Sequence, residues 1–324
     1  MKRKIKKWVA EIIGLFIVLL GVTLLSFSLM YIAPGDPART ILQSGGTMPS
    51  EEAIQEKREE MGLDRPFLEQ YGSWLWNFVH GDLGVSMIDG RNVSDEVTKA
   101  LGKSAVLAVT SLAAGVAAAL PLGVMSAARK EKMFDRITGF FVFIRLCMPS
   151  FLVGIGFLYL FAYCLKLISI SGSGGVSALI LPAATLATGI CARMIRQIRT
   201  LIYEEMKHPY VDGLRSRGIR ETQILFVHIL RNAMLPIITM IALSFGELLG
   251  GTAITEIIFS WPGIGRLVMT AIGEHDYTII QGFVVMIALI AATLTGFSDI
   301  FQNRQISEVS YYMVYVLLLT ILMK

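Results

Sequence analysis

Residues 104–128 read SAVLAVTSLAAGVAAALPLGVMSAA, a run of 25 residues without a charged side chain. An α-helix needs about 20 apolar residues to cross the roughly 30 Å hydrocarbon core of a bilayer, so this stretch predicts a transmembrane helix. Five further segments have the same character. They are Ile12–Ile32 with 21 residues, Leu146–Leu165 with 20 in a helix expected to begin near Ile137, Val176–Ala192 with 17, Ala233–Thr255 interrupted only by Glu247, and Tyr277–Ser298 with 22.

A length of 324 residues suggests about two soluble domains, but the composition favours six membrane helices instead. Hydrophobic residues make up 54% of the chain, charged residues only 17%, and the mean hydropathy is +0.62. Continuous apolar runs, in place of short segments of alternating hydrophobicity, exclude a β-barrel. Three cysteines cannot build a disulfide framework, and a net charge of +4 is too small to indicate a nucleic-acid partner. We therefore expect an all-α integral membrane protein in the lipid bilayer.

Lysine and arginine are concentrated in alternate connections. The N-terminus carries five, the 129–136 turn four and the 193–232 segment eight, whereas the 34–103 segment has seven against twelve acidic residues. Because cytoplasmic loops of membrane proteins are enriched in these cations, the pattern predicts that both termini are cytoplasmic in a bacterial-type inner membrane.

The chain divides accordingly into four parts. Residues 1–33 are the basic N-terminus and first helix, 34–103 an extracytoplasmic region, 104–300 a five-helix core containing the cytoplasmic loop 193–232, and 301–324 an atypical tail. The basic start and apolar run also resemble a signal peptide, but the run exceeds the about 7–15 residues of such a region and no A-x-A site follows. We expect the first helix to be retained.

The long outer connection contains more than a simple turn requires. Ser50 predicts the cap of a short helix that ends at Gly62. Trp74, Trp76 and Phe78 follow, and aromatic residues of this kind favour a membrane–water interface. Two interpretations remain open: the aromatics anchor the loop at the lipid headgroups, or they form a cap that meets an external partner.

The inner connection contains a short helix between two breaks. Residues 204–219 read EEMKHPYVDGLRSRGI, in which His208-Pro209 interrupts the preceding helix and Gly218 ends a new one formed by Tyr210–Arg217. Orientation in the membrane and contact with lipid headgroups account for basic residues here, but not for the short helix. A rigid projecting helix suits insertion into a groove of a soluble partner.

At these residues the chain resembles the permease subunits of ATP-binding-cassette importers for dipeptides, oligopeptides and nickel. The family's cytoplasmic signature is an E-A-A-like triplet, then Gly, then a later Leu-Pro pair. Here Asp212-Gly213-Leu214 occupies the triplet, with Leu214 in place of alanine, and Gly218 and Leu235-Pro236 follow. Further segments match in the family's order: Gly62–Pro66, Met148–Phe151, His228–Ala233 and Ile258–Gly265.

This resemblance implies the six-helix transmembrane domain of a type I ABC importer. It also implies that the short cytoplasmic helix couples the permease to an ATPase, with the altered triplet tuning the coupling differently. The residues expected to carry this coupling are Tyr210, Val211, Asp212, Gly213, Leu214, Arg215, Arg217 and Gly218.

The branch of the family and the end of the chain are separate questions. Gln70–Trp76, Phe245–Gly251 and Glu274–Tyr277 look closest to the nickel-importing branch, so we expect import of free or chelated nickel, with dipeptide or oligopeptide import as the alternative. The chain leaves the family pattern after Asp299, where a new apolar run, Tyr311–Met323, is too short to span comfortably. A surface-lying helix, a reading-frame change and an extra element all remain open.

No nucleotide or metal site is expected in this chain. Leu101–Ser104 reads LGKS like the end of a P-loop, but Val97 stands where the first glycine is needed. The four histidines form no compact ligand motif. The resemblance implies that two ATP-binding subunits carry the ATP and Mg, and that a second permease of the same fold and an extracytoplasmic binding protein complete the importer. The chain is thus expected to be a transport subunit and not an enzyme.

Two rival classes find little support. A secondary transporter driven by an ion gradient predicts two related halves with paired intramembrane polar sites, and no repeat is evident. An intramembrane protease predicts paired aspartates, a serine with a base, or H-E-x-x-H, none of which occurs in a suitable position.

Charged and small residues within the predicted spans are candidates for the translocation pathway. A carboxylate in hydrocarbon is costly unless it faces water or a partner, so Glu247 either lines the pathway or forms a pair. Gly250 and Gly251 are pathway candidates that also permit close helix packing. Trp261 begins a WPGIG segment that either dips toward the pathway or forms an interfacial turn. Arg145 is a second charge within a predicted span, expected near the cytoplasmic half and able to snorkel.

Overall fold

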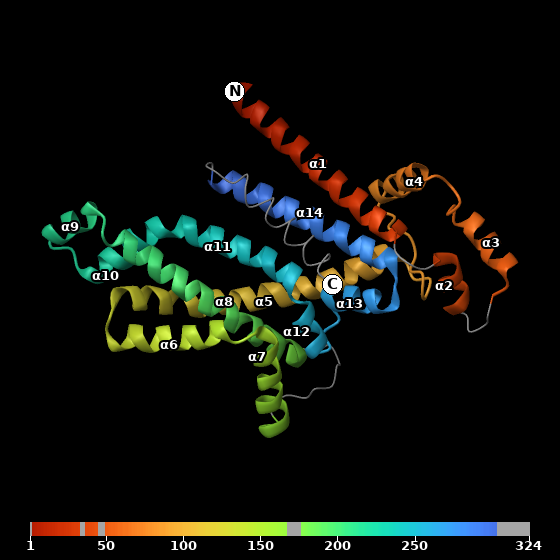
Figure 1. Ribbon diagram of the computed structural model, residues 1–324. Helices are drawn as coiled ribbons and strands as arrows, with labels where there is room; N and C mark the ends of the chain where they lie inside the picture. Colours follow the sequence, from red (N-terminus) through yellow and green to blue (C-terminus); the bar gives the residue numbers. More distant parts are fainter. Residues whose placement is uncertain (1, 33–35, 45–48, 167–175, 303–324) are drawn as a thin grey trace. The chain divides into compact units, whose positions relative to one another are not determined.

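The computed structural model describes residues 2–32, 36–44, 49–166 and 176–302, and most of these residues are helical (Figure 1). The tail 303–324 lies outside the described residues. The elements are α1 (Lys2–Ile32), α2 (Pro37–Ser44), α3 (Glu51–Glu60), α4 (Phe67–Val79), α5 (Val93–Ala128), α6 (Met133–Cys147), α7 (Ser150–Phe157), the π-helix η1 (Leu158–Cys164), α8 (Val176–Glu205), α9 (Pro209–Ser216), α10 (Glu221–Gln223), the π-helix η2 (Ile224–Ile229), α11 (Leu230–Gly251), α12 (Ala253–Ile258), α13 (Ile264–Glu274) and α14 (Tyr277–Gln302).

Each of the six predicted apolar segments is helical. Helices α5 and α8 are each long and apolar enough to cross a membrane, and α1 and α14 contribute the shorter apolar stretches Phe16–Leu29 and Tyr277–Ala291. The remaining two segments are bent pairs of helices. One of them, formed by α10, η2 and α11, bends by 52° at Pro236, whose ring removes a backbone donor from the helix.

The expected continuous helix from near Ile137 to Leu165 is wrong. Helix α6 ends before Met148-Pro149, and α7 with η1 continues at 101° to it. Proline disfavours the helical conformation in the residue before it, and Met148 accordingly has the extended angles φ −90° and ψ 125°. Arg145 therefore lies in the last turn of its helix and not in the first half of a longer one.

The chain forms two compact units, divided at Gly102/Lys103 within α5 and after Trp261. In unit 1 the start of α5 packs against α13 and α14 through a buried apolar cluster. A Cβ at Gly282 would lie 2.9 Å from the side chain of Val93, so α14 approaches α5 closely. Helix α1 joins through Val22, which contacts α14.

The outer segments of unit 1 confirm the predicted capped helix. The hydroxyl of Ser50 accepts a hydrogen bond from the backbone N–H of Ala53 at the start of α3, and Gly62 follows the helix with φ +68°. The aromatic residues of α4 divide into two groups. Trp74 stacks on Phe78 within the unit, whereas Trp76 is 68% exposed and is the one available to a lipid or protein partner.

Unit 2 is organised by close packing between α5 and α8. A Cβ at Gly115 would lie 3.1 Å from the Ile190 side chain, and one at Gly123 would lie 2.9 Å from Ile198. The two contacts advance together by eight residues along both helices, so α5 and α8 run parallel. Alternate spans of a membrane protein must run parallel, and the packing thus agrees with the predicted order of crossings.

Candidate coupling helix and intramembrane site

The predicted short helix between two breaks is confirmed as a separate element, α9, and its coupling role stays a prediction. His208 is extended before the helix and Pro209 occupies its first turn, where the missing N–H costs nothing. Gly218 follows the helix with φ +75°, a conformation that favours glycine. Val211 is fully buried, and α9 packs against η2. Figure 1 shows α9 and α10 at the end of the α8–α11 pair.

Hydrogen bonds brace α9 to both neighbouring long helices. The Tyr210 hydroxyl donates to Glu205 at the end of α8 over 2.9 Å. The Asn232 amide of α11 donates to Glu205 over 3.0 Å and to the Tyr210 hydroxyl over 3.2 Å. Burial, with the bond to Glu205, raises the pKa of Tyr210, so the phenol stays a neutral donor. These bonds join α9 to both α8 and α11.

The remaining coupling candidates lie on α9 and in the turn that follows it. Arg215 donates to Glu221 over 2.6 Å and to Asp212 over 3.1 Å, which ties the end of α9 to α10. A Cβ at Gly213 would meet nothing within 4 Å. Leu214 is half-buried. The exposed candidates are Asp212, Gly213, Arg215, Arg217 and Gly218.

A buried ion pair that the sequence analysis missed lies where α5, α6 and α8 meet. Asp135 of α6 accepts from Arg199 of α8 at 2.6 Å and 2.7 Å, from the Ser126 hydroxyl of α5 and from the backbone N–H of Glu131 over 2.9 Å. An acidic residue in a basic turn was the only signal for it in the sequence. The pair fixes α8 just before the coupling helix.

Among the pathway candidates, Glu247 forms an ion pair. Its carboxylate lies 3.2 Å from Arg193 of α8, with 61% of the Glu247 side chain exposed. Added Cβ atoms at Gly250 and Gly251 would meet nothing within 4 Å, so these glycines make no close contact within the described chain. Trp261 is buried, and its indole N–H donates to the Lys103 carbonyl over 3.1 Å.

A second buried carboxylate was also missed. Glu256 of α12 is fully buried and accepts from the hydroxyls of Ser104 at 2.5 Å and Thr252 at 2.8 Å. The bond from Ser104 ties α12 to α5. Elsewhere in the described ranges, no group of three or more His, Cys, Asp or Glu side chains is arranged to hold a metal ion.

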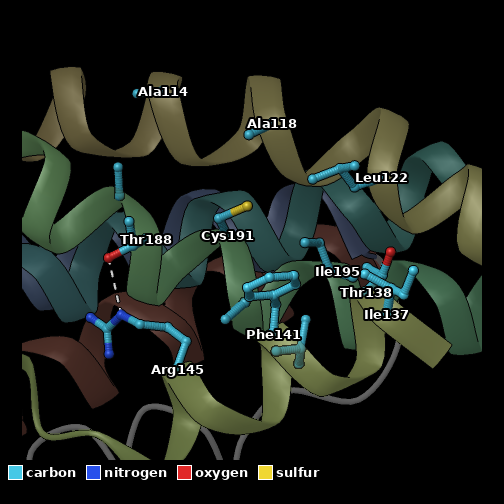
Figure 2. A pocket seen from close by; sticks show the side chains of 13 residues that line it. Ala114, Ala118, Leu122, Ile137, Thr138, Phe141, Arg145, Thr188, Cys191 and Ile195 are labelled. Carbon is cyan, nitrogen blue, oxygen red and sulfur yellow. Dashed lines mark hydrogen bonds between the residues drawn. The ribbon is translucent and has the colours of Figure 1, made fainter. Parts of the chain in front are cut away.

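A cavity of about 470 Å³ lies between α5, α6 and α8 in unit 2. Figure 2 shows Arg145 and Thr188 at one end and Ile137 and Ile195 at the other. Arg145 was expected to be able to snorkel; in the structure its Nε donates to the Thr188 hydroxyl of α8 over 3.0 Å. The other lining residues are largely apolar: Ala114, Ala118, Leu122, Thr138, Phe141, Val142, Ala187, Cys191 and Ala192.

Helical segments of membrane-spanning character and a braced projecting helix define a membrane component of a transport system. The chain belongs to the family described as the binding-protein-dependent transport system inner membrane component, which matches residues 119–311. The N-terminal region of the same kind of membrane component matches residues 5–107. The chain is therefore an all-α permease subunit of a type I ABC importer, in which ATP hydrolysis belongs to separate subunits.

Individual relatives are similar over nearly the whole chain. The glutathione transport system permease protein GsiC of Escherichia coli strain K12 is 32% identical over 281 residues, covering 87% of this chain and 91% of the relative. The protein of the same name from Pectobacterium atrosepticum is 33% identical over 282 residues, with the same coverage. A solved structure of the MetNI methionine ABC transporter matches with a TM-score of 0.48 and 14% identity, covering 68% of this chain and 95% of that one.

Proposed function

We propose that this chain forms half of the translocation pathway of an ATP-driven peptide importer. The observation that supports it is the 32–33% identity to permeases named for glutathione, a tripeptide, over 87% of the chain. The relatives thus favour the peptide alternative over the expected nickel branch. No bond in the substrate needs to change in such a protein.

The partners follow from the same proposal. A second permease of the same fold completes the pathway, two ATP-binding subunits hold ATP and Mg, and an extracytoplasmic binding protein delivers the substrate. Both termini then lie in the cytoplasm, as the distribution of Lys and Arg predicts. Closure of the ATP-binding subunits moves α9, and the bonds of Tyr210 and Asn232 pass this motion to α8 and α11.

Uptake by cells that lack and regain this subunit tests the substrate class. We expect radiolabelled glutathione or dialanine to accumulate only when the subunit is present, while uptake of radiolabelled nickel stays unchanged. Nickel uptake that depends on the subunit, without peptide uptake, contradicts the proposal and restores the nickel interpretation.

The proposed docking of α9 has its own test. Gly213 has open space around it, so Gly213→Trp should leave the fold intact but obstruct a groove that receives α9. We expect the ATP-binding subunits to be lost from the purified complex. Gly72→Trp adds the same bulk at another open position, in α4, and serves as the control. Equal retention of the ATP-binding subunits by both variants refutes docking through α9.

We further propose that Glu247, Gly250 and Gly251 line the pathway, with Trp261 positioning its outer end. The exposed pair of Glu247 with Arg193 and the open space at both glycines support this assignment. Glu247→Gln should impair uptake while the complex still assembles. Full uptake by this variant removes Glu247 from the pathway.

A further inference from the structure

Arg145 carries a charge at membrane depth that no carboxylate balances in the described part of the chain. Its guanidinium donates to the Thr188 hydroxyl over 3.0 Å, the Met148 carbonyl over 3.1 Å and the Thr185 carbonyl over 3.2 Å. All three acceptors are neutral. The carboxylate of Glu247 is paired with Arg193. Since a guanidinium has five N–H donors, two remain for another ligand.

On the predicted topology, the lengths of α6 and α8 put Arg145 close to the middle of the bilayer. It lies twelve residues after Met133, the start of α6, or about 18 Å along the helix axis. Thr185 and Thr188, which it contacts, lie nine and twelve residues after Val176 at the other end of α8, or about 14–18 Å. This depth is too great for a lipid phosphate, which lies outside the roughly 30 Å hydrocarbon core.

The fold makes room for the charged group. A Cβ at Gly189 would lie 2.8 Å from Nη2 of Arg145, so the guanidinium lies directly against α8 at this glycine. Arg145 lines one end of the cavity of about 470 Å³, a volume within the range of about 300–1,000 Å³ typical of small-molecule sites. Because an uncompensated cation is unfavourable in hydrocarbon, this end of the cavity has to meet water or an anion.

We propose that Arg145 binds the carboxylate of the imported peptide during its passage through the membrane. The proposal rests on the proposed function, since a peptide is a solute whose carboxylate such a permease would bring to this depth. The two spare N–H groups bind the carboxylate, and the apolar wall formed by Phe141, Ala118 and Cys191 accepts an uncharged part of the substrate. A single half-exposed cation gives weak binding, which permits release.

The test compares a peptide with its carboxylate and without it. The complete complex, with both permeases, ATP-binding subunits and binding protein, is placed in proteoliposomes, and uptake of dialanine and of dialanine amide is measured at equal concentration. We expect Arg145→Gln to lower dialanine uptake about tenfold, the loss of one charge-assisted contact, and to change amide uptake less than about twofold. The binding protein is the same in all samples, so its own preference cancels when ratios are compared.

The matched control is Arg136→Gln, which removes an exposed arginine from the same helix and should leave both rates unchanged. If Arg145→Gln does not accumulate in the membrane, Arg145→Lys replaces it and should lower the dialanine-to-amide ratio partway. An unchanged ratio, or an equal loss for both solutes, overturns the proposal. A variant that accumulates but no longer retains the second permease also overturns the proposal, because a carboxylate of that subunit is then the counter-ion of Arg145. Failure of the wild-type complex to import either solute refutes the peptide function instead.

Discussion

Replacement of Asp135 by alanine should destabilise unit 2 by about 3 kcal/mol. The carboxylate accepts two bonds from Arg199 and one each from Ser126 and the backbone of Glu131. Removal of one partner from a buried ion pair costs about 3–5 kcal/mol, because the other charge stays buried without compensation. The lower value applies here, since 35% of the Arg199 side chain is exposed and can be hydrated again.

A double-mutant cycle separates this ion pair from other effects. Asp135→Ala and Arg199→Ala each leave a charge unpaired, whereas the double variant leaves none. We therefore expect the double variant to lose about 2 kcal/mol less than the sum of the two single losses. Glu204 and Lys207 provide the control: they pair at 2.8 Å with side chains 60% and 52% exposed. Their coupling should not exceed about 0.5 kcal/mol.

The measurement is the free energy of unfolding of the purified subunit, obtained by titration with SDS in mixed micelles and followed by circular dichroism. A coupling energy for Asp135 and Arg199 no larger than that of the exposed control pair refutes the reasoning. The reasoning is also refuted if Asp135→Ala alone costs less than about 1 kcal/mol, because the ion pair then behaves like one on the surface.

Three other contacts lead to measurable outcomes. Gly123→Ala should lower the unfolding midpoint, at a cost of about 1–3 kcal/mol, because the new Cβ would lie 2.9 Å from an α8 side chain. The control is Gly102→Ala on the same helix, where the new Cβ meets nothing within 4 Å, and this change should be neutral or stabilising. Hydrogen bonding from Arg91 lowers the pKa of Asp89 from 3.8 to about 2. The stabilisation of the fold by the Asp89 carboxylate should therefore be complete above about pH 4 and lost as the pH falls toward 2. Thermal unfolding of wild type and Asp89→Asn across this range measures it, and a stability difference that persists at pH 2 contradicts the prediction. Tyr210→Phe removes the hydroxyl between α8 and α11 and should speed amide exchange in α9 about fivefold by mass spectrometry, whereas unchanged exchange means that the bond does not brace α9.

Local signals in the sequence predicted the helices that the structure contains. Ser50 marked the start of α3, and His208-Pro209 with Gly218 marked both ends of α9, because caps and breaks depend on neighbouring residues alone. The apolar runs predicted where the long helices lie. These features needed no knowledge of how helices pack.

Features that depend on packing were not predictable in the same way. Pro121 and Pro182 lie inside α5 and α8, whereas Pro149 separates two helices at 101°. A proline therefore permits a break, but the tertiary structure decides whether one forms. The contacts of Asp135 with Arg199 and of Arg145 with Thr188 join residues 64 and 43 positions apart, and no local pattern indicates them.

The two glycine contacts between α5 and α8 limit how this importer can change shape. Ile190 and Ile198 of α8 each lie against a glycine of α5, which has no side chain, and the two contacts are eight residues apart on both helices. Sliding one helix past the other by a single turn, about 5.4 Å, would press these isoleucines into the side chains that lie between the two glycines. We therefore expect α5 and α8 to move together as one rigid block during alternating access, with any sliding confined to contacts between other helices.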